Sequence, residues 1–341
     1  YRGPDLDSAT DAELVAVSAR LNNVLRRFGE GWALFFEAER VPANQYPGHR
    51  FGDAASWLVD QERYASFSVD GAHHESRYYL TLLYLPPPEH QGRAERLLYE
   101  RQEGYSDEAD VWGQLAWFET ETTRALELLA SILPEAEALD DAETLAYLHG
   151  TISDKRHPVA VPTVPTHLDA ILCDTSFLGG VEPKLGRQHL RLLTVTGFPN
   201  TTTPGLLDAL NDLGFAYRWT TRWIALDKIQ ANRQLTKLRR QWFAKRKSVA
   251  AILREVMFNR ETTLLDSDAD NKAADADEAL QELGADDVAF GYLTTTLVVG
   301  DADPKRADEK LLALERIING RGFTTIRETL NAGSGDWSRG G

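Results

Sequence analysis

The order of the elements predicted between residues 190 and 328 constrains the fold more than any other feature of the sequence. Two helices, one opened by Pro204-Gly205 and one by Pro304, separate short runs rich in β-branched and aromatic residues. Apart from a helical insertion after the second strand, this order is that of a ferredoxin-like split βαβ unit. We therefore predict an α+β fold, with antiparallel strands and helices packed on them. The four strands are predicted over 190–198, 215–226, 288–299 and 323–328.

The first region of the chain, residues 1–150, reads as a second α+β unit. Helix caps are available at Asp7, Ser8 or Thr10 before an apolar helical repeat, and at Asp53 before a second helix. We predict strands over 32–40 and 77–86, each dense in aromatic and aliphatic residues. A long helix is predicted over 110–133.

The rest of the chain divides by composition. Residues 151–189 are predicted to be a connector, because Pro158, Pro162 and Pro165 and several glycines interrupt any regular element. Residues 190–332 form the ferredoxin-like unit, with a helical insertion over 228–284. Residues 333–341 have the Gly- and Ser-rich composition of a flexible or added tail. Because the chain starts at Tyr1 without Met, we expect a fragment of a longer protein.

The composition limits the classes of partner and compartment. Hydrophobic residues make up 43% of the 341 residues, with 8 Trp, which is enough for packed cores. A net charge of −15 argues against a protein that coats nucleic acid with its whole surface. The single cysteine, Cys173, rules out an intramolecular disulfide and fits a reducing compartment. No stretch reaches the ~18 apolar residues that a membrane span needs, and no signal peptide is visible.

One stretch departs sharply from the acidic average. Residues 228–254 hold nine Lys or Arg and no Asp or Glu. Apolar residues recur at helical spacing from Leu235 to Val256, so the cations are predicted to cover one broad face of a helix. Such a face attracts an anionic partner, or it is simply a solvated helix surface. The candidate interaction surface consists of Lys237, Arg239, Arg240, Lys245, Arg246 and Lys247.

Motifs for catalysis and cofactor binding are absent from the sequence. No Gly-Lys-Ser or Gly-Lys-Thr occurs, so a Walker A phosphate loop is excluded. The acidic run 266–277 lacks the glycine and the final glutamate of a calcium loop. His73-His74 would point to opposite faces of a strand, and His149 and His157 are isolated in the sequence. We therefore predict no catalytic residue, no bound cofactor and no metal ligand, and a structural or surface role for the histidines.

Long blocks of the sequence resemble the N-terminal region of the TrbE-type conjugal transfer ATPases. These proteins belong to the CagE/TrbE/VirB family of type IV secretion ATPases. The resemblance covers nearly all of residues 1–332 and consists of ordered blocks rather than a short motif. The blocks are YRGPDLDSAT, GAHHESRYYLTLLYLPP, LDDAETLAYLH, LRLLTVTGFPNTTTPGLLDALN, PGLLDALNDLGFAYRWTTRWIALDK, LTKLRRQWFAKRKS and NKAADADEALQELGAD.

The resemblance implies a function. Family members are cytoplasmic ATPases, peripherally associated with the bacterial inner membrane, that assemble as oligomers expected to be hexamers. Their ATP and Mg²⁺ sites lie in a motor domain that follows this region, and ETLNA at 328–332 is similar to the approach to that motor. The resemblance thus implies a non-catalytic docking and oligomerisation region. Its expected partners are other subunits of a type IV secretion or conjugation channel, including small inner-membrane components.

Two alternatives remain. A single-stranded nucleic-acid-binding module could use the basic helix, with Trp219, Trp223 and Trp242 stacking on bases. The same tryptophans at strand and helix spacing are also typical of core residues. An autonomous enzyme is disfavoured, because no nucleophile, metal set or phosphate loop is found in the sequence.

Overall fold

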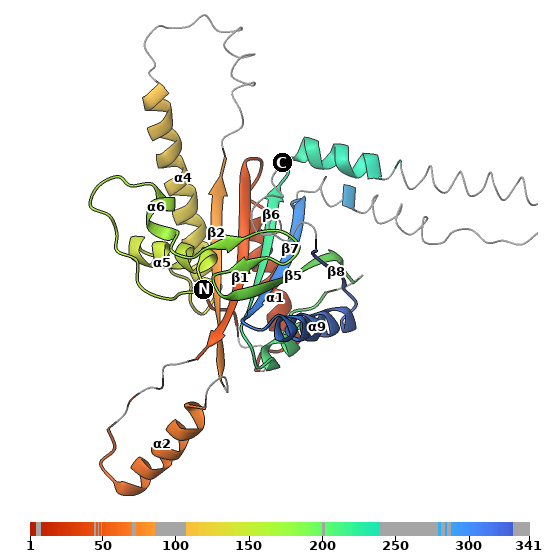
Figure 1. Cartoon of the computed structure of the whole chain (residues 1–341). Helices are drawn as coiled ribbons and strands as arrows, with labels where there is room; N and C mark the ends of the chain where they lie inside the picture. The colour runs from red at the N-terminus through yellow and green to blue at the C-terminus, as the bar shows by residue number, and fades with distance from the viewer. Residues whose placement is uncertain are drawn as a thin grey trace, which may run out of the picture.

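The computed structural model describes most of the chain (Figure 1). The described residues are 1–4, 8–43, 46, 48, 50–69, 73–85, 107–199, 202–238, 240, 279–280, 284 and 288–329. The helices are α1 (Asp11–Leu25), α2 (Ala54–Phe67), α4 (Asp107–Ala130), α5 (Asp141–Ile152), α6 (Leu168–Leu172), the 3₁₀ helix η1 (Asp208–Asp212) and α9 (Pro304–Gly320). The strands are β1 (Trp32–Pro42), β2 (His74–Tyr84), β3 (Phe177–Leu178), β4 (Lys184–Leu185), β5 (Gln188–Gly197), β6 (Tyr217–Ala225), β7 (Gly291–Asp301) and β8 (Thr324–Arg327).

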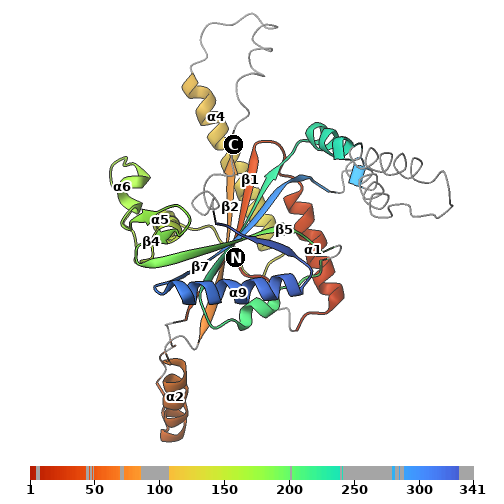
Figure 2. The ribbon, with the colours of Figure 1, turned by 45° about the vertical axis from the view of Figure 1, so that its right-hand side comes forward.

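All eight of these strands belong to one sheet. Its order is β2-β1-β6-β7-β5-β4-β3, and β8 also pairs with β5. Every pairing of neighbouring strands is antiparallel, so the predicted α+β class is confirmed. The strands twist across one another in Figure 2, with α9 and α1 on one side of the sheet and α5 and α6 on the other.

The second half of the chain has the predicted ferredoxin-like topology. Its four strands lie in the order β8-β5-β7-β6, in which the first and third strands along the chain are central. One of its two helices is shorter than predicted. The helix expected after Gly205 is only the five-residue 3₁₀ helix η1. Gly205 has a φ of 78°, outside the helical range, and Arg40 donates to the carbonyl oxygens of Asn211 and Leu213 at the far end.

The two halves of the chain share the sheet through β1 and β6. Glu37 lies opposite Thr220, Glu39 lies opposite Arg218, and the pairing runs from Ala33–Ile224 to Arg40–Tyr217. The sequence patterns predicted both strands but not this partnership. That residues 1–150 and 190–332 form separate units stays a prediction, and the β1–β6 ladder joins them through backbone hydrogen bonds.

Three apolar clusters hold the described structure together. The largest lies under α9, where Ala307, Leu311, Leu314 and Ile318 recur on one face and meet β5 and β7. A second cluster surrounds Trp32, which packs edge-on against Phe28 and stacked on Phe118 of α4, with ring centroids 4.9 and 5.5 Å apart. A third, smaller cluster joins α5 to α6.

Two local features differ from the sequence-based expectations. Helix α5, capped by Asp140 and Glu143, was not predicted. The connector 151–189 holds α6, β3 and β4, although its prolines break longer elements.

The predicted insertion begins as a helix over 228–238, and most of it lies outside the described residues, as does the acidic run 266–277. None of the described helices is long and apolar enough to cross a bilayer.

Candidate functional site

Helix α2 stands apart from the sheet at the end of the β1–β2 hairpin (Figures 1 and 2). None of its 14 residues is buried, although Trp57, Leu58, Val59 and Tyr64 are large and apolar. Trp57 is 54% exposed and Leu58 is 56% exposed. A helix that presents several large apolar side chains to solvent is typical of an interaction surface.

A small aromatic group shapes this arm. Tyr46 lies edge-on to Tyr64 at 5.5 Å between ring centroids and also contacts Phe67. Its hydroxyl donates a hydrogen bond to Asp60 Oδ1 at 2.6 Å, and this bond is the main reason why the pKa of Tyr46 is raised. Asp53 caps the start of α2 by accepting from the backbone N–H of Ser56. The arm is therefore an ordered helix with its own local contacts.

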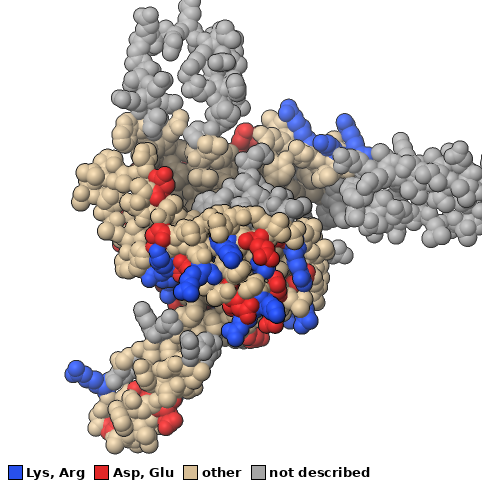
Figure 3. Space-filling model, viewed as in Figure 1, with Lys and Arg blue, Asp and Glu red and all other residues tan. Residues whose placement is uncertain are grey.

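Helix α4 presents a second exposed apolar surface. Trp112 is 68% exposed, and Leu115 and Trp117 are also exposed. Further along α4, Phe118 and Ala125 enter the cluster around Trp32, so this stretch of the helix is held to the sheet. Figure 3 shows charged side chains of both signs gathered on the body of the molecule, whereas the arm of α2 is mostly uncharged on this face.

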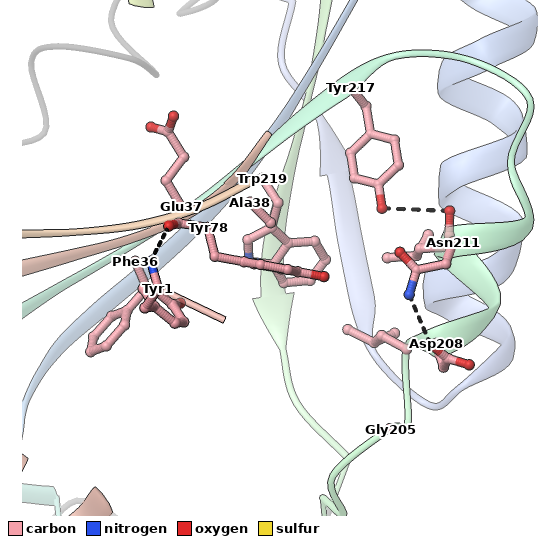
Figure 4. A pocket seen from close by; sticks show the side chains of 12 residues that line it. Tyr1, Phe36, Glu37, Ala38, Tyr78, Gly205, Asp208, Asn211, Tyr217 and Trp219 are labelled. Atoms are coloured by element: carbon pink, nitrogen blue, oxygen red, sulfur yellow. Dashed lines mark hydrogen bonds between the residues drawn. The ribbon is translucent and has the colours of Figure 1, made fainter. Parts of the chain in front are cut away.

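A pocket of about 330 Å³ lies between the sheet and the segment that leads into η1 (Figure 4). Its walls are largely aromatic. Tyr217 and Trp219 line it from β6, Phe36 from β1 and Tyr78 from β2. The amino group of Tyr1 donates to the carbonyl oxygen of Tyr78 at 2.9 Å and places the Tyr1 ring beside this wall.

The chemistry of the pocket does not suit a nucleotide. Burial raises the pKa of Tyr1 and of Tyr217 to about 12, so both hydroxyls stay protonated. No Lys, Arg or His is among the described residues that line it, whereas Asp208 and Asn211 are. The side chain of Glu37 points away from the cavity in Figure 4. With mostly aromatic walls and no Lys, Arg or His side chain among these lining residues, the pocket fits an apolar or aromatic group better than a phosphate.

Opposite the pocket, the other face of β1 carries a cluster of ionised side chains. Arg218 Nη1 lies 2.9 Å from Glu37 Oε1, and its Nη2 lies 2.6 Å from Glu39 Oε1. Burial alone would lower the pKa of Arg218, but the two carboxylates outweigh burial and raise it. Arg156 also pairs with Glu39, and both arginines donate to the carbonyl oxygen of Gly150 in α5. The cluster therefore fixes α5 against the sheet.

The connector brings two histidines and an aspartate together beside α5. Nε2 of His149 lies 3.2 Å from Asp174 Oδ1, and Nε2 of His157 lies 3.3 Å from Asp174 Oδ2. Ser153 and Thr175 donate to Asp174, and these bonds, with that of Ser153 the largest, hold the pKa of Asp174 far below its usual range. His149 and His157, which are isolated in the sequence, become neighbours in the fold.

The structure describes two residues of the predicted basic surface. Lys237 and Arg240 are exposed on the helix that follows β6. Arg239, Lys245, Arg246, Lys247 and Trp242 lie outside the described residues. Trp219 and Trp223 pack against the apolar clusters, which fits the expectation that they are core residues.

Two family models match the chain. The N-terminal domain of the type IV secretion system ATPase VirB4/TrbE matches residues 1–92. The CagE, TrbE, VirB family, described as a component of the type IV transporter system, matches residues 220–339.

The chain belongs to the CagE/TrbE/VirB family.

Relatives with a conjugal transfer name agree with this assignment. The chain is similar to the conjugal transfer protein TrbE of Rhizobium radiobacter, with 30% identity over 352 residues that cover 97% of this chain and 42% of the relative. Sinorhizobium fredii (strain NBRC 101917 / NGR234) has a probable conjugal transfer protein TrbE in two pieces. The second piece is 30% identical over 190 residues, which cover 56% of this chain and 28% of that protein. The first piece is 42% identical over 89 residues, which cover 25% of this chain and 60% of that protein. The chain thus spans less than two thirds of each of these family members.

Proposed function

We propose that this chain is the docking and oligomerisation region of a conjugative transfer ATPase of the CagE/TrbE/VirB family, and that it is not itself catalytic. In this proposal the longer protein hydrolyses ATP in a separate motor domain and drives channel assembly or substrate transfer. Its partners are other subunits of the type IV secretion channel, with small inner-membrane components among them. The protein is cytoplasmic and attached to the inner membrane through these contacts.

One observation carries the proposal: the exposed apolar surface of α2. Trp57, Leu58 and Val59 are each more than half exposed on a helix without a buried residue. An exposed apolar patch is costly in water unless a partner covers it. The matching family is described as a component of the type IV transporter system. The partner that we propose for α2 is therefore another subunit of that system.

The docking proposal is tested by co-purification. The chain is co-expressed with the small inner-membrane subunits of the same conjugation system, and complexes are extracted in mild detergent. We expect Trp57→Ser combined with Leu58→Ser to weaken co-purification at least tenfold, because interface anchors of this kind carry most of the binding free energy. Val15→Ser is the matched control, since Val15 is a single exposed apolar residue on α1, 64% exposed. Binding that survives the double substitution would remove α2 from the interface.

The claim that the chain is not catalytic has a separate test. The sequence lacks a Walker A loop, and no Lys, Arg or His side chain is among the described residues that line the pocket. We expect the purified chain neither to bind a fluorescent ATP analogue nor to release phosphate from ATP with Mg²⁺. Turnover that persists through successive purification steps at constant specific activity would contradict this.

Light scattering on the same sample measures whether the chain forms the expected oligomer.

A further inference from the structure

The two histidines and the aspartate beside α5 form an arrangement that the proposed docking function does not use. His149 lies in the last turn of α5, His157 lies in the connector, and Asp174 follows α6. One ligand atom from each residue lies within 4.8 Å of the other two. Three segments that are separate in the sequence thus converge on one point.

The ring of His157 is held by two neighbours. Its Nδ1 lies 3.0 Å from the carbonyl oxygen of Pro158, and its Nε2 lies 3.3 Å from Asp174 Oδ2. Fixing one ring nitrogen on a backbone carbonyl is also how proteins orient metal-binding histidines.

The second histidine adds an independent observation. His149 is buried, with 1% of its surface exposed. Its Nε2 lies 3.2 Å from Asp174 Oδ1, so both histidines face the same carboxylate, one from the interior and one from the surface.

The two imidazole rings lie close together, 4.4 Å apart between centroids. A single divalent ion could bind one nitrogen of each ring and the carboxylate together. Ligand atoms around a tetrahedral zinc ion are about 3.3 Å apart. The distances from His149 Nε2 to Asp174 Oδ1, 3.2 Å, and from His157 Nε2 to Asp174 Oδ2, 3.3 Å, are close to that spacing, and one ligand atom of each residue lies within 4.8 Å of the others.

We propose that His149, His157 and Asp174 bind a divalent transition-metal ion, for which zinc is the best fit. Two imidazole nitrogens and one carboxylate oxygen are ligands that zinc accepts, with a fourth position left for water. Ser153 and Thr175 donate to Asp174 and orient its carboxylate, as outer partners of a metal site do.

One cation already lies near the site. Lys155 Nζ is 3.2 Å from Asp174 Oδ2 and 2.8 Å from the Asp174 carbonyl oxygen. Its side chain is 54% exposed, so it can keep the carbonyl contact or turn into solvent when an ion approaches. The bound ion would fasten the connector to α5 and thereby hold Arg156, the neighbour of His157, beside Glu39.

Zinc titration of the whole chain tests the proposal. The protein is stripped with a chelator, and zinc binding is followed by calorimetry and by thermal unfolding. We expect one ion per chain and a rise in Tm of about 4 °C at a zinc concentration one hundred times Kd. Cobalt(II) should bind at the same stoichiometry with the visible absorption of a tetrahedral site, whereas Mg²⁺, which prefers oxygen ligands, should give no shift.

Two variants and one control make the result specific. His157→Gln and Asp174→Asn should each weaken zinc binding at least about tenfold, since even outer partners of metal ligands are worth ~10–100-fold. The side chain of His157 is 50% exposed, so its replacement should leave the fold intact. His167→Gln is the matched control, because His167 is exposed in the same connector and outside the cluster. No zinc binding, or binding that His157→Gln leaves unchanged, would overturn the proposal and leave the cluster as a contact between side chains without a metal.

Discussion

Arg218 on β6 and Glu39 on β1 are direct cross-strand partners, and their side chains meet at 2.6 Å between Nη2 and Oε1. This pair joins the N-terminal half of the chain to the ferredoxin-like half. Glu37 completes the arrangement on the same face of β1. Both carboxylates are buried, with 5% of Glu37 and 7% of Glu39 exposed, so they depend on the guanidinium for compensation.

Arg218→Met should therefore be strongly destabilising. It leaves two buried carboxylates without their main partner, and removal of one member of a buried ion pair costs about 3–5 kcal/mol. Urea unfolding followed by tryptophan fluorescence measures the loss. Arg156→Met should cost less, about 1 kcal/mol at most, because the Arg156 side chain is half exposed. Arg187→Met, at an exposed position, serves as the control, and equal losses in all three variants would contradict this account.

Leu314→Ala should destabilise the ferredoxin-like half. Leu314 belongs to α9 and is fully buried, and a buried leucine reduced to alanine costs about 2–5 kcal/mol through lost burial and the cavity that remains. Leu139→Ala is the control, because Leu139 is 42% exposed and its truncation should change stability by less than about 0.5 kcal/mol. Thermal unfolding of both variants gives the comparison. A small effect at Leu314 would mean that the α9 core is loosely packed.

Gly31→Ala should disturb the start of β1. Gly31 has a φ of 86°, and an added Cβ would lie 2.7 Å from the carbonyl oxygen of Leu85. Left-handed backbone strain alone costs a residue with a Cβ about 1–2 kcal/mol, and the clash adds to it. Gly29→Ala is a close control, because nothing lies within 4 Å of the corresponding Cβ. Chemical denaturation should separate the two variants by about 2 kcal/mol.

The ion pair between Asp301 and Lys310 predicts a pH dependence. Asp301 Oδ2 lies 2.8 Å from Lys310 Nζ, and its Oδ1 accepts from the backbone N–H of Asp303 at 2.9 Å. The bond from Lys310, followed by that from Asp303, lowers the pKa of Asp301 in the folded state. A lowered folded-state pKa contributes stability above the unfolded value of about 3.9 and loses it as the pH falls through the folded value.

Asp301→Asn should therefore lower the stability at pH 7, by up to about 1 kcal/mol for a partly exposed pair. The difference from the unmodified chain should shrink as the pH falls below about 4, because the carboxylate then takes up a proton in both states. Unfolding curves at several pH values test this. Glu137→Gln, at an exposed position, should show no such pH-dependent difference. A constant difference at all pH values would point to lost packing instead of lost charge.

The local elements could be read from the sequence because their signals are local. Thr10 caps α1 together with Glu13, Asp53 caps α2, and Pro304 begins α9, each through short-range hydrogen bonding or a fixed φ. The order of elements in residues 190–328 then predicted the ferredoxin-like strand order. The capping box of α5, formed by Asp140 and Glu143, is an equally local signal and could have revealed that helix.

The contacts between distant segments could not be predicted from such signals. A period-two pattern identifies a strand but not its neighbour, so the β1–β6 pairing stayed hidden. Charged residues at alternate positions, Glu37 and Glu39 in one strand and Arg218 in another, were the available hint of a cross-strand cluster. The cluster of His149, His157 and Asp174 had no recognisable spacing, because its residues come from a helix and two loop segments that only the fold brings together.

The hairpin that carries α2 has an evolutionary consequence. Strands β1 and β2 pair without interruption from Trp32–Tyr84 to Pro42–His74, and α2 lies in the segment that connects Pro42 to His74. Since the ladder closes before the helix begins, the segment between residues 43 and 73 can be exchanged or shortened while the sheet keeps its register. If α2 binds a partner as proposed, replacing this segment would change the binding specificity without changing the sheet.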